Sequence, residues 1–275
     1  MPTMDCMPFY YAKVSGIYDN IDLDVNIYTY KAQMDCDTAF VNKYVDVSYT
    51  DLIRAALLQS KNHPLRVIMQ TDGHHELITA KSKRINDIEQ LKGKMVAIAR
   101  HSITDMLLDT VASQSKLDIS TIYHPQINNI ILRQDMLRNA TIDGAFLQEP
   151  YITQTKLEGN KAIYDSRDMN IHIMALMVNS NIDKNKEIQI SQLIEGYNQA
   201  VDAINNLENP DLIKQTINLY PIQKKYLDSI NIPVFKHAEP VNKDNINIAI
   251  EFLRRRQLIH DHYTGDSLTT LKYLE

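Results

Sequence analysis

The stretch YVDVSYTDLIRAALLQSKNHPLRVIMQT, which covers residues 44–71, decides the fold class of this protein. Residues 44–49 and 65–70 are rich in β-branched, aromatic and other apolar side chains, which favours two short strands. Between them, Leu52, Ala55 and Leu58 recur at the spacing of an amphipathic helix over residues 51–60. A strand, a helix and a second strand in this order indicate a parallel sheet with crossover helices.

The same alternation continues on both sides of this stretch. Further strands are expected at residues 23–30, 76–80, 95–100, 121–124, 143–148, 161–165 and 171–178. Further helices are expected at residues 35–42, 85–91, 104–116, 130–139 and 151–157. The last hundred residues change character and predict only helices, at residues 187–205, 211–219, 223–229 and 244–257.

The alternation falls into two blocks, one over roughly the first 75 residues and one over residues 82–170. The runs at 76–80 and 171–178 have the character of two strands that join the blocks. We therefore expect a discontinuous first lobe, residues 1–80 plus 172–275, and a second lobe, residues 81–171. Each lobe is predicted to be a mixed, mostly parallel sheet flanked by helices.

The bulk composition excludes some classes of protein. The chain has 275 residues and a net charge of −5, with 29 Lys and Arg against 34 Asp and Glu, so a nucleic-acid partner is not expected. No apolar run approaches the roughly 18–20 residues that a membrane span needs. Cys6 and Cys36 could form one disulfide in an oxidising compartment or stay reduced, and the sequence leaves both open.

Ligands of open α/β sheets bind beyond the carboxyl ends of the strands, so the polar residues that follow predicted strands are the candidate binding residues. They come from the opening turn of the chain, from the quoted stretch and the loop after it, and from two turns of the second block. In chain order they are Thr3, Asp5, Cys6, Tyr49, Thr50, Asp51, Asp72, His74, His101, Ser102, Thr104, Gln148 and Glu149.

Several of these residues have a plainer alternative as helix caps. Asp5, Asp35, Thr50 and Ser102 are suitable N-cap residues, and Ser102 with Asp105 resembles a capping box. For any one of them, capping alone is the more common role. Taken together, they bring polar groups and helix N-termini to one edge of both predicted sheets, as a cleft between two lobes requires.

Motifs of known catalytic and metal chemistry are missing from the sequence. There is no H-E-x-x-H, no C-x-x-C, no G-x-S-x-G and no G-x-x-x-x-G-K-[ST]. The adjacent His74 and His75 point in different directions on a strand or turn, so they are not expected to share a metal ion. Cys6 near a helix N-terminus could have a lowered pKa, but no histidine partner is identifiable for a catalytic thiol. No cofactor is expected.

Short motifs in a consistent order resemble the type II solute-binding proteins of ABC importers. The opening PT and PFYYA, then GIY and LDV, match the start of this family, and YVDV at residues 44–47 is similar to its G-x-V-D strand. Tyr44 departs from the small residue that is usual there. LKGKMVA at residues 91–97, MLRN with IDGA at 136–145, and LQEPY at 147–151 resemble later motifs of the family. The match covers about the first 180 residues.

The resemblance implies a two-lobed fold and a binding function. The branch that it indicates includes binders of sulfonates, taurine, nitrate and thiamine-pyrimidine precursors. The expected protein lies outside the cytoplasm, closes two lobes around a small polar ligand, and delivers that ligand to an ABC permease. Family members carry an apolar strand just before PT, of which only Met1 remains here. An export signal with a lipid-attachment cysteine is therefore expected upstream of Met1.

The sequence leaves alternatives open both for the class of ligand and for the class of function. Several carboxylates in the candidate site favour an amine, a pyrimidine or another ligand rich in hydrogen-bond donors. The helix N-termini near Asp51 and Ser102 could instead hold a small oxyanion, with Arg100 and Arg167 as nearby cations. The alternatives to a transport protein are a biosynthetic enzyme on the same fold, similar to the pyrimidine synthase, and a ligand-sensing domain.

Overall fold

Residues 44–71 fold into a strand, a helix and a second strand, as their pattern predicts. The structure is a computed structural model and describes residues 2–169 and 171–274. Strand β1 (Val47–Asp51) leads into α4 (Leu52–Ser60), and β2 (Leu65–Thr71) follows. The strand starts later than predicted because the side chain of Tyr44 is 75% exposed and lies outside the sheet.

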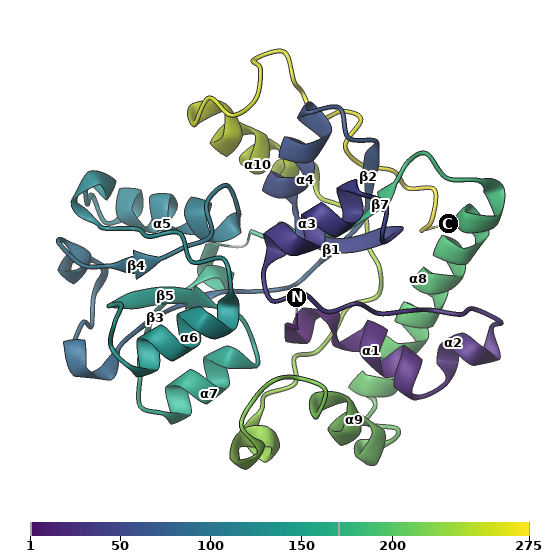
Figure 1. The fold of residues 1–275 in the computed structure, drawn as a ribbon, viewed down its shortest axis with the longest axis horizontal. Helices are drawn as coiled ribbons and strands as arrows, with labels where there is room; N and C mark the ends of the chain where they lie inside the picture. The colour runs from purple at the N-terminus through teal and green to yellow at the C-terminus, as the bar shows by residue number, and fades with distance from the viewer. Residues whose placement is uncertain (1, 170, 275) are drawn as a thin grey trace.

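The first sheet has the order β1-β7-β2 (Figure 1). Its central strand, β7 (Met174–Asn179), is buried along its whole length and runs antiparallel to both neighbours. Helix α4 packs beside this sheet and against α10 (Lys243–Arg255), whereas α3 (Gln33–Val41) contacts β1.

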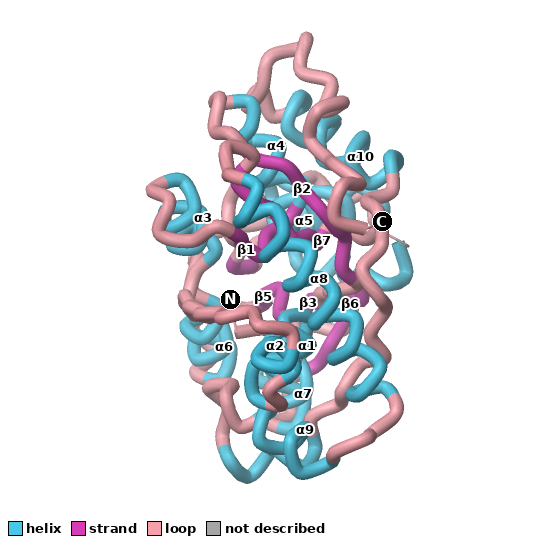
Figure 2. Tube along the Cα trace, turned by 90° about the vertical axis from the view of Figure 1, so that its right-hand side faces the viewer, coloured by secondary structure: helices cyan, strands magenta, loops and turns pink. Residues whose placement is uncertain are grey.

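The second sheet has the order β4-β5-β3-β6. Its strands are β4 (Val96–Ala97), β5 (Gly144–Leu147), β3 (Glu76–Thr79) and β6 (Lys161–Asp165). The helices of this lobe are α5 (Ile103–Gln114), α6 (Ile130–Arg138) and α7 (Tyr151–Leu157). Figure 2 shows the strands of the two sheets as two separate groups.

The expectation that the sheets are mostly parallel is wrong at the level of neighbouring strands. Among the described strands, only β4 and β5 form a parallel ladder, and the other four ladders are antiparallel. These antiparallel ladders arise because the chain crosses between the two sheets twice. Strands β3 and β7 each arrive from the other lobe, so they run against the strands beside which they insert.

The chain changes sheets between Thr71 and Glu76 and again between Asp165 and Met174. Strand β3 belongs to the second sheet, although residues 76–80 were assigned to the first lobe. The boundaries of the lobes otherwise stay a prediction.

Helices from both ends of the chain pack together beside the first sheet. They are α1 (Met7–Val14), α2 (Ile17–Asn20), α8 (Lys184–Asn205) and α9 (Pro210–Ile217). Helix α8 buries Ile190, Ile194, Tyr197 and Val201 at helical spacing. Gly196 lets α8 approach α2 closely, because a Cβ atom there would lie 2.4 Å from the ring of Tyr18.

Short 3-10 turns complete the described structure. They are η1 (Met4–Cys6), η2 (Lys81–Lys83), η3 (Ile88–Leu91), η4 (Ile119–Thr121), η5 (Ser166–Met169) and η6 (Lys224–Ser229). Two of them, η3 and η6, replace helices predicted at residues 85–91 and 223–229. Within the described part of the chain, no helix combines the length and the apolar character that crossing a bilayer requires.

Two predicted strands do not form. Among the described residues, 121–124 make one isolated parallel bridge, between Tyr123 and Met95. Residues 23–30 have no regular secondary structure and join no ladder with a described residue, and they run as a coil below β1 in Figure 1. A groove of about 410 Å³ is lined by this segment, by residues 44–49 and by the start of α8. The segment and β1 thus lie on two sides of this groove, and among the described residues no ladder joins them.

Candidate functional site

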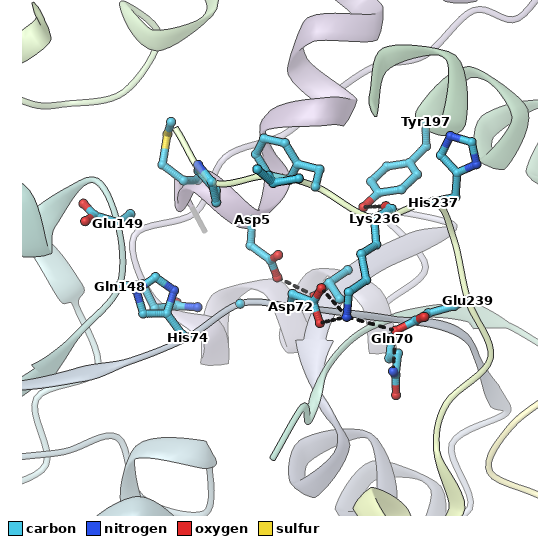
Figure 3. Close-up of a pocket in the computed structure, with 16 residues that line it drawn as sticks. Asp5, Gln70, Asp72, His74, Gln148, Glu149, Tyr197, Lys236, His237 and Glu239 are labelled. Atoms are coloured by element: carbon cyan, nitrogen blue, oxygen red, sulfur yellow. Dashed lines mark hydrogen bonds and ion pairs between the residues drawn. The ribbon is translucent and has the colours of Figure 1, made fainter. Parts of the chain in front are cut away.

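A small pocket lies where the opening turn of the chain, the end of β2, the turn after β5, α8 and residues 233–239 meet (Figure 3). Its volume is about 40 Å³, room for a few water molecules. We call it the acidic pocket. Its lining residues are Met4, Asp5, Gln70, Thr71, Asp72, Gly73, His74, Gln148, Glu149, Tyr197, Pro233, Val234, Phe235, Lys236, His237 and Glu239.

Asp5 is held in this pocket by two hydroxyl groups. The hydroxyl of Tyr49 donates to Oδ2 of Asp5 at 2.5 Å, and the hydroxyl of Thr71 donates to the same oxygen. Burial raises the pKa of Asp5 to about 6, against the lowering effect of these hydrogen bonds. Gly73 makes room for the carboxylate, because a Cβ atom at this position would lie 2.6 Å from Oδ2.

Asp72 is paired with the ammonium group of Lys236 and with the imidazole of His172, which come from two other segments. Nζ of Lys236 lies 2.9 Å from Oδ2 of Asp72 and 4.0 Å from Oε1 of Glu239. Nδ1 of His172 lies 3.0 Å from Oδ1 of Asp72. In Figure 3 the side chain of Lys236 reaches down between Asp72 and Glu239. Lys236 is therefore the cation at the centre of a cluster of carboxylates.

The far side of the pocket comes from the second lobe. Nε2 of Gln148 donates to the hydroxyl of Tyr49 at 3.4 Å, and the backbone N–H of Met4 donates to the carbonyl of Glu149 at 2.8 Å. Burial raises the pKa of Glu149 and lowers that of His74, so the pocket favours the uncharged imidazole. Residues of both lobes thus meet directly at the acidic pocket.

Three buried side-chain oxygens beside the pocket lack a partner among the described residues. They are Oγ1 of Thr3 and of Thr50, both in fully buried residues, and Oε1 of Gln148, in a residue that is 2% exposed. A buried polar atom without a hydrogen bond costs about 1–3 kcal/mol. Such atoms are compatible with a site that gains hydrogen bonds when a polar molecule binds.

Asp51 connects two helices that belong to different lobes. Its Oδ1 accepts from the N–H of Arg54 at 3.0 Å and so caps α4. Its Oδ2 accepts from the N–H of Ile103, the first residue of α5, at 3.3 Å. Burial raises the pKa of this carboxyl to about 6. The negative charge that helix N-termini favour is therefore already supplied at this point by the protein itself.

The structure brings together five of the predicted binding residues in the acidic pocket, namely Asp5, Asp72, His74, Gln148 and Glu149. Tyr49 adjoins them through its hydroxyl. Thr3 and Thr50 are fully buried next to this region, and the hydroxyl of Tyr220 donates to the carbonyl of Thr3.

The other predicted binding residues lie elsewhere or have structural roles. Cys6 and Cys36 are buried thiols that line the groove beside β1, and burial raises the pKa of Cys6 to about 12. Ser102 and Thr104 hydrogen-bond within the turn before α5. His101 lines a separate cavity of about 200 Å³ at the contact of α5 with the residues after α10. No group of three or more His, Cys, Asp or Glu side chains in the described residues could hold a metal ion.

Sequence reasoning missed the contribution of the C-terminal part of the chain. Tyr197 and residues 233–239 line the pocket, but the helical spacing of Tyr197 indicated only a core position. Residues 233–239 carry charged side chains, begin with Pro233 and are followed by Pro240. This composition is also typical of an ordinary surface loop. No pattern in the sequence pointed from Lys236 to Asp72, 164 positions away.

Comparison with known proteins establishes the family. The profile described as NMT1/THI5 like matches residues 3–213. The chain belongs to the NMT1/THI5-like family. No curated protein sequence matches the chain significantly.

Solved structures show that this NMT1/THI5-like protein has the periplasmic-binding-protein fold. The aliphatic sulphonate binding protein SsuA from Escherichia coli is 17% identical, with 99% of this chain and 97% of that one covered and a TM-score of 0.77. The nitrate-binding protein NrtA from Synechocystis PCC 6803 is 12% identical, with 99% and 82% covered and a TM-score of 0.78. The desulfurization enzyme DSZB is 10% identical, with 99% and 95% covered and a TM-score of 0.71. The resemblance inferred from the sequence motifs is thus confirmed for family and fold.

Proposed function

We propose that this protein is a solute-binding protein whose two lobes close over a small ligand rich in hydrogen-bond donors. The observation that carries the proposal is the acidic pocket, in which Asp5 and Asp72 of the first lobe face Gln148 and Glu149 of the second. Ligand contacts to both lobes would favour the closed arrangement over the open one. The family and the sulfonate- and nitrate-binding neighbours support a binding function.

The charge of the pocket favours an amine or an amino-pyrimidine, such as a thiamine-pyrimidine precursor, over a small oxyanion. Four carboxylates line it, from Asp5, Asp72, Glu149 and Glu239, against the single ammonium group of Lys236. The helix N-termini that could attract an oxyanion share the carboxylate of Asp51 instead. A sulfonate would have to enter against both features.

The wider setting is part of the same proposal. We propose that the protein acts outside the cytoplasm, delivers its ligand to an ABC permease, and is held at the membrane by a lipid on a segment upstream of residue 1. Labelling of intact cells with a membrane-impermeant reagent tests this location. Labelling that requires cell lysis would contradict it.

An enzyme on the same fold is the second candidate, because the desulfurization enzyme DSZB is among the structural neighbours. The best nucleophile in the N-terminal segment, Cys6, lies in the groove beside β1, and burial raises its pKa to about 12, which disfavours the reactive thiolate. Turnover of a bound compound by the purified protein would favour the enzyme.

The proposal is tested by thermal shift with hydroxymethyl-aminopyrimidine, taurine, ethanesulfonate and nitrate. A ligand at about 100 times its Kd stabilises the native state by about 2.7 kcal/mol, which corresponds to several degrees in Tm. We expect a shift with the amine-bearing compounds. We also expect their affinity to fall below about pH 6, because Asp5, with its pKa of about 6, then becomes neutral. If none of the four compounds raises Tm, the proposed ligand class is wrong.

A matched pair of glycine variants locates the binding site. In Gly73→Ala, the new Cβ atom would lie 2.6 Å from Oδ2 of Asp5 and 2.9 Å from the hydroxyl of Tyr49, so it displaces the carboxylate. In Gly144→Ala, the nearest atom would be an ordinary 3.5 Å away. Ligand binding should be lost in G73A and kept in G144A. Equal binding by both would place the ligand outside the acidic pocket.

A further inference from the structure

We propose that the ammonium group of Lys236 occupies the subsite for a cationic nitrogen of the ligand, and that it must leave Asp72 when such a ligand binds. The inference rests on the proposed function, and it adds a residue that determines which ligand charge the site accepts. Its first support is geometric. Nζ of Lys236 lies 2.9 and 3.2 Å from the two oxygens of Asp72 and 4.0 Å from Oε1 of Glu239, as an alkylammonium ligand would.

The backbone that carries Lys236 is fixed by side chains of α8. Asn205 exchanges two hydrogen bonds with the backbone of Phe235, at 2.8 and 3.0 Å. The hydroxyl of Tyr197 donates to the carbonyl of Lys236, and Asn198 accepts from the N–H of Ala238 at 2.8 Å. Displacement of the ammonium therefore does not require the segment to detach.

The side chain of Lys236, in contrast, can move. It is 58% exposed, whereas that of Asp72 is only 28% exposed. Lysine side chains have four rotatable bonds and a strongly hydrated head group, so Nζ can exchange Asp72 for water by changing rotamers. The pocket of about 40 Å³ would then grow by the volume that the end of this side chain vacates.

The charges around the site explain why a cation should replace a cation. Without Lys236, the carboxylates of Asp5, Asp72 and Glu239 would keep hydrogen bonds from Tyr49, Thr71, His172 and Gln70, but no lysine or arginine among the described residues would pair with them in the pocket. An amine ligand restores the neutralisation that Lys236 provides. A neutral ligand or an anion cannot do so, and an anion would need Lys236 to stay in place. Lys236 thus selects for ligands whose positively charged group binds the carboxylate of Asp72 more tightly than Nζ of Lys236 does.

The test compares Lys236→Gln with Lys92→Gln, which removes the same charge from an exposed lysine in the other lobe. Calorimetry with taurine and ethanolamine as probes, both of which carry an alkylammonium group at neutral pH, measures the affinities, and ethanesulfonate is the matched probe without an amine. Because an exposed ion pair is weak, we expect K236Q to bind the amine probes about two- to fivefold more tightly than the wild-type protein. K92Q should equal the wild type.

Several outcomes would overturn the inference. If K236Q binds the amine probes equally or more weakly, Lys236 is not a competitor of the ligand, while the proposed function still stands. If K236Q loses binding of ethanesulfonate that the wild-type protein shows, Lys236 is a direct ligand of an anion. If no probe binds any variant, the proposed function fails together with the inference. Lys236→Arg keeps the positive charge, so a comparison of its affinities with those of K236Q shows whether the loss of charge causes the effect. The Tm of each variant confirms that it is folded.

Discussion

At the scale of single residues, Asp51 shows how one carboxylate can serve two helices. It caps α4 in its own lobe and accepts a hydrogen bond from the first turn of α5 in the other. Its side chain is almost fully buried, with 2% exposure of the residue. Burial disfavours the charged form, whereas the helix N-termini favour it, and the raised pKa shows that burial dominates.

This balance predicts a pH-dependent stability. The pKa of Asp51 is about 6 in the folded protein against an unperturbed 3.8, so the folded state holds the proton more tightly than the unfolded state. The contribution of Asp51 to stability is then fully present below about pH 4 and is lost as the pH rises to about 6. As the pH rises from about 4 to about 6, we expect the free energy of unfolding of Asp51→Asn to increase by up to about 3 kcal/mol relative to that of the wild type.

Urea unfolding of both proteins at about pH 4 and pH 7.5 measures this gain. Asp24→Asn, at an exposed carboxyl on the other side of the groove, controls for the change in net charge. A difference between D51N and wild type that is the same at both pH values would show that Asp51 does not titrate in this range.

The candidate site was predictable from sequence where local chemistry follows a strand. Asp5, Asp72 and Gln148 were predicted because ligands bind beyond the ends of strands, and all three line the acidic pocket. Lys236 was not found, because its role depends on a contact between residues far apart in the chain. Ser102 and Thr104 were interpreted as binding residues, but their hydroxyl groups hydrogen-bond to the turn before α5.

At the scale of elements, α8 supports the pocket as well as the core. One side of the helix buries apolar residues, whereas Asn198 and Asn205 hold the backbone of residues 233–239. Asparagine side chains are well suited to this, because each can donate to a carbonyl and accept from an N–H. An irregular segment thereby acquires a fixed path without becoming a strand.

Removal of one of these side chains should loosen the segment. Asn205→Ala deletes two hydrogen bonds with Phe235, each worth about 0.5–1.5 kcal/mol. We expect faster amide hydrogen exchange over residues 233–238 and a loss of about 1–2 kcal/mol in the free energy of unfolding. Gln199→Ala is the control, since Gln199 is exposed and bonds to Glu195 of its own helix. Unchanged exchange in N205A would show that other contacts fix the segment.

The elements themselves were predictable to different degrees. Long helices with a clear apolar stripe, such as α5 and α8, lie close to their predicted limits because the stripe itself drives their packing. The strands depended more on context. Residues 23–30 alternate apolar and polar side chains at first, but they form no ladder with a described residue. The order β1-β7-β2 places a late segment between two early ones.

At the scale of the whole molecule, the two lobes touch at more places than the pocket. The guanidinium of Arg256, just after α10, lies 2.7 Å from Asp109 and 3.4 Å from Asp105, both on α5. Together with the hydrogen bond from Ile103 to Asp51, these ion pairs connect α5 to the residues around α4 and α10.

We expect Arg256→Gln to shift the free protein toward the open arrangement. An ion pair with partly exposed groups is worth up to about 1 kcal/mol, so the ratio of open to closed molecules should rise about two- to fivefold. Small-angle X-ray scattering would report a larger radius of gyration, and the effect should shrink at high salt. Arg255→Gln, which removes the same charge at the adjacent position, should leave the radius of gyration unchanged. An identical increase in both variants would refute a specific role for Arg256.

The groove between β1 and residues 23–30 has a consequence for the behaviour of the protein in solution. On that side the backbone of β1 forms no ladder with a described residue, yet its residues from Ser48 to Asp51 are buried, and the carbonyl of Tyr49 accepts from Nε2 of Gln33 at 2.9 Å. A side-chain amide of α3 thus occupies part of the edge that a further strand would otherwise use. Protection of this kind disfavours edge-to-edge pairing between copies of the chain.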